Sequence, residues 1–216
     1  MLFQLHLLEE TGDILVFLPS KEQITRFCKD LVKQIETLRE NAPPLLSIIP
    51  LYSSLPFELQ EEIYEPAPPG KSSRRCIVSS DLAETCLATE NIRFVIDSGF
   101  SKQRVYNSVL GVESSLITPV SRLKAMIRAQ RAGKVSLGMC FRLYTMAAYE
   151  SELTEEHQAE ILRSDLLSTL LILKKKGIDD FKNLETLDNP SPDQLRTLLE
   201  DLKSLGALNE EVTDVS

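Results

Sequence analysis

The sequence has 216 residues, 43% of them hydrophobic and 26% charged, which is enough for one ordinary domain with a buried core and a second, small domain. Its formal net charge of −8 excludes a broad basic surface for nucleic acid, so any contact with phosphates must be confined to a local groove. Four cysteines without a CxxC pair, with only two histidines, argue against a zinc site or a disulfide framework and favour a reducing compartment.

The apolar runs are of strand length, and even the longest, such as ILVFL at 14–18, are too short to cross a membrane. The start, MLFQLHLLEE, has neither a basic leader nor a small-residue cleavage site, so we expect no signal peptide.

Strand and helix patterns alternate along the first part of the chain. Each short apolar run ends at a proline, serine or aspartate, and an amphipathic segment follows it. The strands expected on this basis are 14–18, 45–52, 74–80 and 92–97, and the helices are 21–40, 57–65 and 81–88. This alternation predicts an α/β fold with a mainly parallel sheet.

The middle of the chain predicts three further elements. Two extended arms around 108–111 predict a β-hairpin over 101–120, and a helix over 121–134 and a strand over 139–145 are expected to follow. Functional sites on parallel sheets gather at the carboxyl ends of the strands. We therefore expect three polar clusters, 79–81, 97–99 and 128–134, to meet at that edge.

The composition changes after Thr145. An acidic, helical stretch leads into the segment 160–180, which contains an amphipathic helix that should end at Gly177. A second helix within 188–209 opens with two prolines and should end at Gly206. The sequence thus predicts two domains, residues 1–145 and a small helical one over 146–216.

The basic segment 128–134 allows two interpretations. Arg128, Arg131 and Lys134 are spaced by three residues, which places them on one ridge of the expected helix. Three cations on a ridge repel one another unless an anion lies opposite, and arginine forks match phosphate oxygens. The alternative is a solvated basic helix face, which the segment taken alone favours.

Two other polar clusters also allow two interpretations each. Ser80 and Asp81 end a strand at a helix start, where they form either a small anion site or an ordinary N-cap. Asp97, before a glycine turn, is either a ribose ligand or a turn former. No Walker A motif and no Ser-His-Asp or Cys-His arrangement occurs, so a nucleotide would be bound without the main phosphate loop.

Taken in order, the segments resemble the second RecA-like domain of DEAH-box RNA helicases. The matching stretches are GDILVFLPS (12–20), LYSSLP (51–56), QEEIYEPAPPG (60–70), IVSSDLAETCLATENIRFVIDSGFSKQRVYN (77–107) and RAQRAGKVSLGMCFRLYT (128–145). The similarity continues through 160–181 and 199–211 into that family's winged-helix domain and covers nearly the whole chain. It implies a RecA-like sheet with helices on both faces, a β-hairpin and a partial winged helix.

The resemblance also implies an activity. The family hydrolyses an NTP between two RecA-like domains and pulls single-stranded RNA through a channel, with residues 101–120 as the strand-separating hairpin. Arg131 and Lys134 match the arginine fingers, which stabilise transition-state charge. The nucleotide-binding residues implied are Tyr64, which stacks on the adenine, Cys86, Asp97 and Arg128, and the RNA-binding residues implied are Ser80, Asp81 and Thr85.

Several positions depart from the family pattern. Its last motif, Gln-Arg-x-Gly-Arg-x-Gly-Arg, reads here Ile127-Arg128-Ala129-Gln130-Arg131-Ala132-Gly133-Lys134, and Cys86 replaces the serine that senses the γ-phosphate. A lysine does not reproduce a bidentate fork, and losing a finger costs about 10³–10⁵ in rate. We therefore expect weak or no NTP hydrolysis in the complete protein.

The resemblance implies partners beyond this chain. The phosphate loop and the metal site would lie in a preceding first RecA-like domain, with the ratchet and OB domains following, so the sequence is interpreted as a fragment that is inactive alone. The implied cofactor is ATP with magnesium at that first domain, and the implied partners are RNA, the other helicase domains and a G-patch type activator, with no membrane. The implied compartment is the nucleus or nucleolus, with the cytoplasm as the alternative.

Two competing functions stay open from the sequence. One is a degenerate helicase-like scaffold that holds RNA or a protein without turnover. The other is an unrelated α/β nucleotide binder that takes ATP by itself.

Overall fold

The computed structural model describes residues 1–8, 12–38, 46–61, 63, 74–85, 87, 89, 91–107, 112–156, 158–178 and 187–208. The helices are α1 (Leu2–Leu8), α2 (Lys21–Leu38), α3 (Phe57–Glu61), α4 (Leu82–Thr85), α5 (Arg122–Ala129), α6 (Met146–Ser151), α7 (Leu166–Lys175) and α8 (Pro192–Ser204), with a 3-10 turn η2 (Glu160–Leu162). The strands are β1 (Asp13–Phe17), β2 (Leu46–Leu51), β3 (Arg74–Ser79), β4 (Ile92–Asp97), β5 (Phe100–Asn107), β6 (Val112–Pro119) and β7 (Met139–Arg142).

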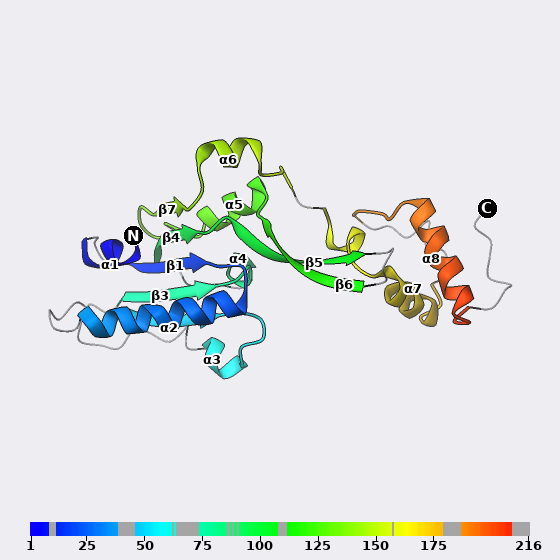
Figure 1. Ribbon diagram of the computed structural model, residues 1–216, viewed down its shortest axis with the longest axis horizontal. Helices are drawn as coiled ribbons and strands as arrows, with labels where there is room; N and C mark the ends of the chain where they lie inside the picture. Colours follow the sequence, from blue (N-terminus) through cyan, green and yellow to red (C-terminus); the bar gives the residue numbers. More distant parts are fainter. Residues whose placement is uncertain are drawn as a thin grey trace. The chain divides into compact units, whose positions relative to one another are not determined.

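Five of the strands form one sheet in the order β2-β3-β1-β4-β7, and every neighbouring pair is parallel (Figure 1). β5 and β6 form a separate two-stranded sheet, the predicted hairpin. The predicted α/β class with a parallel sheet is therefore confirmed.

The central strand β1 explains why ILVFL is apolar throughout. Ile14 and Val16 lie in a buried cluster with residues of α1 and α2, whereas Leu15 and Phe17 lie in a second buried cluster with Ala83 of α4. Because successive side chains of a strand point to opposite faces, a strand covered on both faces must be apolar at every position.

Helix α5 is shorter than the sequence predicts. Ser121 caps its start, since the Ser121 hydroxyl accepts the Lys124 N–H at 3.2 Å, and the helix ends at Ala129 instead of residue 134. Gly133, with φ +81°, donates its N–H to the Ile92 carbonyl at 2.9 Å, so the chain turns onto the amino end of β4. The prediction that Arg131 and Lys134 share a helical ridge with Arg128 is wrong.

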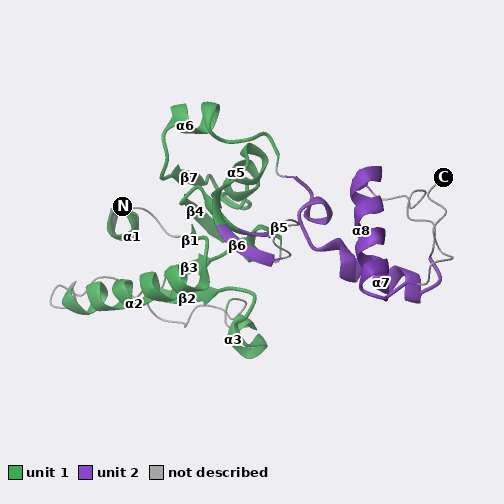
Figure 2. Cartoon of the chain, turned by 45° about the vertical axis from the view of Figure 1, so that its right-hand side comes forward, with its two compact units in different colours: residues 1–102, 117–157 green, residues 103–116, 158–216 purple. Residues whose placement is uncertain are grey.

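The chain forms two compact units, residues 1–102 with 117–157 and residues 103–116 with 158–216 (Figure 2). The outer part of the hairpin belongs to the second unit, where the Tyr106 N–H donates to the Arg163 carbonyl at 2.8 Å. The predicted domains 1–145 and 146–216 stay a prediction, while compactness divides the chain after residue 157.

The second unit contains the two predicted helices, both shorter than expected. α7 and α8 pack through buried Leu170, Leu195 and Leu202. The glycines predicted to stop them, Gly177 and Gly206, have positive φ of 81° and 69°. Among the helices that the structure describes, none has the length and apolar character that a membrane crossing needs.

Candidate functional site

Arg128 lies at the centre of a buried ion cluster in the first unit. Its side chain is 0% exposed and donates to Asp97 at 2.6 Å, to Glu84 at 2.8 Å and to Asp81 at 2.8 Å. A buried guanidinium requires such partners, because an unpaired charge in the interior is very costly. The cluster therefore joins α5, α4 and the carboxyl end of β4.

The contacts of Arg128 extend to two further strands. Both of its Nη atoms donate to the Phe100 carbonyl at 3.2 Å, and its guanidinium lies 4.7 Å from the centre of the Phe17 ring. One side chain thus links β1, β4 and the start of the hairpin to α5.

Asp97 is fully buried and faces Arg128. Its carboxylate also accepts the Gly99 N–H at 3.0 Å and the Tyr144 hydroxyl at 3.1 Å. Burial, together with the nearby Asp97 charge, raises the pKa of Tyr144, so its hydroxyl keeps the proton that it donates. In this state Asp97 holds the cluster together and presents no surface to a ligand.

Lys124, one turn before Arg128, is a second cation of the cluster. Its ammonium group bonds to Asp81 and lies 3.6 Å from Glu84. Burial and the neighbouring Asp81 raise the pKa of Glu84, against the lowering effect of Lys124 and Arg128. The anions that face Arg128 and Lys124 are therefore carboxylates of the chain itself.

Arg131 and Lys134 lie beyond the end of α5. The half-buried Arg131 donates to the carbonyl of Leu87 at 3.3 Å and to the carbonyl of Glu84. Lys134 is exposed and follows Gly133, which is bonded to the amino end of β4. These two cations are therefore not on the buried side of the cluster.

The predicted gathering of all three polar clusters at the carboxyl edge is wrong for the last one. Residues 79–81 and 97–99 do follow the carboxyl ends of β3 and β4, and Arg128 reaches them. Residues 133–134 lie at the amino edge instead. The reason is topological: β7 runs parallel to β4, so the chain must return to the amino edge before β7 begins.

The amino edge also carries an ion pair between Arg75 and Asp13. Arg75, near the start of β3, donates to the Ile63 carbonyl at 2.7 Å and forms an ion pair of 2.6 Å with Asp13 at the start of β1. Residue 63 therefore lies at this edge. Tyr64, the next residue, and Cys86 lie outside the described residues.

The predicted RNA-binding residues lie around α4. Ser80 is half-buried and its hydroxyl accepts the Leu82 N–H at 3.5 Å, so it caps the helix start. Asp81 retains 32% side-chain exposure, and Thr85, at the end of α4, is exposed. Ser80 and Asp81 thus follow the carboxyl end of β3, and Thr85 lies four residues further along the same segment.

Sequence reasoning missed three members of the cluster: Lys124, Tyr144 and the charged side chain of Glu84. The spacing of four residues between Lys124 and Arg128, and of three between Asp81 and Glu84, is a weak signal that two charged helix faces meet. The Tyr144 contact had no local signal, since it spans 47 residues.

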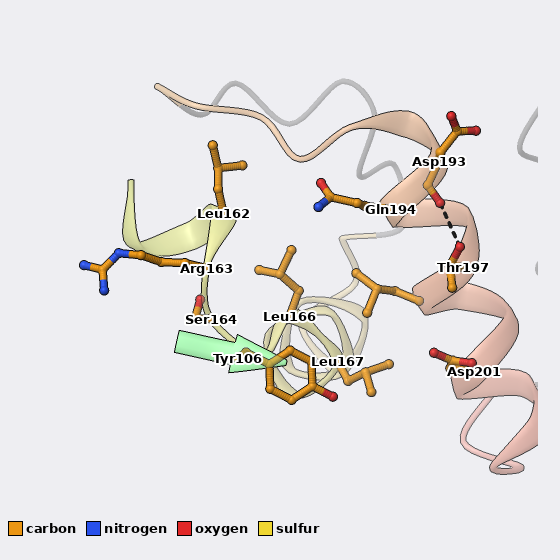
Figure 3. A pocket seen from close by; sticks show the side chains of 11 residues that line it. Tyr106, Leu162, Arg163, Ser164, Leu166, Leu167, Asp193, Gln194, Thr197 and Asp201 are labelled. Atoms are coloured by element: carbon orange, nitrogen blue, oxygen red, sulfur yellow. Dashed lines mark hydrogen bonds between the residues drawn. The ribbon is translucent and has the colours of Figure 1, made fainter. Parts of the chain in front are cut away.

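A separate cavity lies in the second unit. Its volume is about 490 Å³, and Figure 3 shows Tyr106, Leu166 and Leu167 on one side and Gln194 and Thr197 of α8 on another. None of the predicted site residues lines it. Within the described part of the chain, no group of three or more His, Cys, Asp or Glu side chains is arranged to hold a metal ion.

Comparison with known proteins identifies the family. The sequence model of the helicase conserved C-terminal domain matches residues 1–136. The chain belongs to this family. The resemblance of its motifs to DEAH-box RNA helicases is confirmed by the relatives that it matches.

One such relative is the pre-mRNA-splicing factor ATP-dependent RNA helicase prp22 of Schizosaccharomyces pombe, 41% identical over 208 residues. The match covers 96% of this chain and 18% of that protein. The crystal structure of the E. coli DExH-box NTPase HrpB matches 94% of this chain and 24% of its own, with a TM-score of 0.75 and 30% identity. This helicase C-terminal domain thus spans less than a quarter of either relative.

Proposed function

We propose that this helicase C-terminal domain supplies one wall of an ATP site and one part of an RNA channel in a DEAH-box RNA helicase. The observation that supports this most is the position of one predicted arginine-finger residue and two predicted RNA-binding residues at opposite edges of one sheet. Lys134 lies at the amino edge, and Ser80 and Asp81 lie at the carboxyl edge. Arg128, predicted to bind the nucleotide, pairs with Asp97 and Asp81 at the carboxyl edge.

The amino edge fits a polyphosphate. Lys134 is exposed there, and Arg131 is half-buried nearby with its guanidinium on main-chain carbonyls, contacts that a phosphate can replace. These two residues would hold the phosphates of ATP, whose magnesium would be bound by the first RecA-like domain. Their positive charge would oppose negative charge that develops on the transferred group.

The second candidate function is a scaffold that binds RNA or a protein without turnover. Lys134 in place of an arginine favours it, because an ammonium group makes single hydrogen bonds where a guanidinium makes a fork. Ile127 and Gln130 favour it too, since neither matches the family pattern.

A chimera separates the two functions. The segment of the S. pombe relative that matches this chain is replaced by the chain, and ATP hydrolysis with single-stranded RNA is measured in single turnover. We expect a rate about 10³-fold or more below that of the unmodified relative, because loss of one arginine finger has an effect of this size. Restoring the family pattern by Ile127→Gln, Gln130→Gly and Lys134→Arg together should then recover most of the lost rate.

Each outcome assigns the function. Recovery by the triple reversion supports a weakened helicase half. A chimera that folds and binds RNA but stays inactive after reversion supports the scaffold. A chimera as fast as the relative overturns the weakened hydrolysis, and one that binds neither ATP nor RNA overturns the proposal.

The partners and compartment follow from the same proposal. The proposed partners are RNA, a first RecA-like domain, the ratchet and OB domains and a G-patch type activator. A nuclear or nucleolar location accords with the splicing relative. Binding of ATP by this chain alone, measured by calorimetry, would favour an unrelated nucleotide binder instead.

A further inference from the structure

Lys124 of α5 forms an ion pair with Asp81, which lies on the segment proposed to contact RNA. The two side chains retain 27% and 32% exposure, so the pair lies at the surface of an otherwise buried cluster. Asp81 is shared, because its other oxygen accepts from Arg128 at 2.8 Å. Of the two cations in this cluster, Lys124 is thus partly exposed, whereas Arg128 is fully buried.

A carboxylate at this position works against a phosphate ligand. Asp81 lies between Ser80 and the exposed Thr85, on the same short segment. A partly exposed negative charge repels an approaching phosphate, and the same carboxylate occupies the ammonium group that would attract one. Arg128 is fully buried and does not take over that role.

Resting on the proposed function, we propose that Lys124 is a phosphate-binding residue for single-stranded RNA and that Asp81 holds it in an autoinhibitory ion pair. RNA binding then exchanges the Asp81 carboxylate for a phosphate oxygen at the ammonium group. Glu84, 3.6 Å away, stays bonded to Arg128 and does not move with the exchange.

The exchange has a signature in salt dependence. A phosphate contact made by a free lysine releases counterions from the nucleic acid, about 0.7 per contact on a single strand. A contact that takes Lys124 from Asp81 leaves this carboxylate with Arg128, whose charge Glu84 and Asp97 also share, so a counterion is taken up there and the net release is close to zero. A purely structural role of the pair would not change this slope.

The test measures binding of a short fluorescein-labelled oligouridylate to the 216-residue chain by anisotropy, at several salt concentrations. Asp81→Asn keeps an oxygen that accepts from Arg128 and removes the negative charge. Asp30→Asn is the matched control, because Asp30 is exposed on α2 and pairs with Arg26 at 3.9 Å. Lys124→Gln and the double variant complete the set, and hydrogen exchange of the β1 amides verifies that each is folded.

We expect Asp81→Asn to bind about fivefold more tightly than Asp30→Asn, with a salt slope steeper by about 0.7. Adding Lys124→Gln should return the slope to that of the wild type. If wild type binds RNA and the two asparagine variants agree in affinity and slope, the autoinhibitory pair is overturned and the proposed RNA contact stands. If wild type, Asp30→Asn and Asp81→Asn all fail to bind, the RNA contact is overturned and the inference with it.

Discussion

Arg128 donates a hydrogen bond of 2.6 Å to Asp97, and neither side chain is exposed to solvent. The pair connects helix α5 to the carboxyl end of strand β4, and Glu84 and Asp81 complete the shell around the guanidinium. The basic segment that follows the hairpin thus contains a buried cation that organises the fold, a half-buried one, Arg131, and an exposed one, Lys134.

Removing the buried cation should destabilise the first unit strongly. Arg128→Met leaves Asp97 and Glu84 as buried carboxylates without their main partner, at an expected cost of about 3–5 kcal/mol. Hydrogen exchange of the β1 and β4 amides measures this free energy without mixing in the second unit. Arg26→Met, which breaks the exposed pair with Asp30, is the control and should cost about 0.5 kcal/mol or less. Equal effects of the two substitutions would contradict the central place of Arg128.

Glu84 should give the unfolding free energy a distinct pH dependence. Because its pKa is raised by burial, the folded protein takes up a proton at a higher pH than the unfolded chain does. Its contribution to stability therefore increases as pH falls from neutral through the raised pKa. The stability of wild type relative to Glu84→Gln should rise on acidification, as measured by the same hydrogen exchange.

Glu22 provides a control of opposite sign. A hydrogen bond from the Ser20 hydroxyl lowers the pKa of this exposed glutamate, so its contribution is lost as pH falls through the lowered value. Wild type relative to Glu22→Gln should therefore lose stability on acidification. If the stability of wild type relative to both variants decreased on acidification, the pKa of Glu84 would not be raised in the folded protein, and the prediction would be wrong.

Gly99 should not tolerate a side chain. Its φ is +82°, and an added Cβ would lie 2.5 Å from Cδ1 of Tyr144, whose hydroxyl donates to Asp97. Gly177 has nearly the same φ of +81°, but a Cβ added there would have no neighbour within 4 Å. Gly177→Ala therefore measures the cost of the backbone strain alone. Gly99→Ala should destabilise its unit by about 1–3 kcal/mol more than Gly177→Ala destabilises the other, measured by hydrogen exchange. Equal losses would mean that Tyr144 moves aside freely.

The sequence was sufficient for the layers of the fold. ILVFL is apolar at every position because β1 is central, and the hairpin and the glycine stops at Gly177 and Gly206 followed from local chemistry. Such features depend on residues that are close in the chain, so a single sequence contains them.

The contacts of the basic segment could not be predicted in the same way. The carboxylates around Arg128 lie 31 to 47 residues away from it in sequence. The end of α5 is also set from a distance, since Ala129 to Ala132 are compatible with a helix and the stop coincides with the bond from Gly133 to Ile92. The family resemblance supplied roles for these residues without showing which of them would be buried.

Lys134 provides the most direct measurement of whether the amino edge of the sheet faces a polyphosphate. An acyl-phosphate derivative of ATP transfers its acyl group to a lysine amine near the phosphates and releases ATP. In the chimera with the S. pombe relative, we predict that Lys134 is acylated, that excess ATP protects it, and that Lys33, a surface lysine of α2, reacts slowly without protection. Labelling of Lys134 no faster than of Lys33, and unaffected by ATP, would contradict the proposed nucleotide wall.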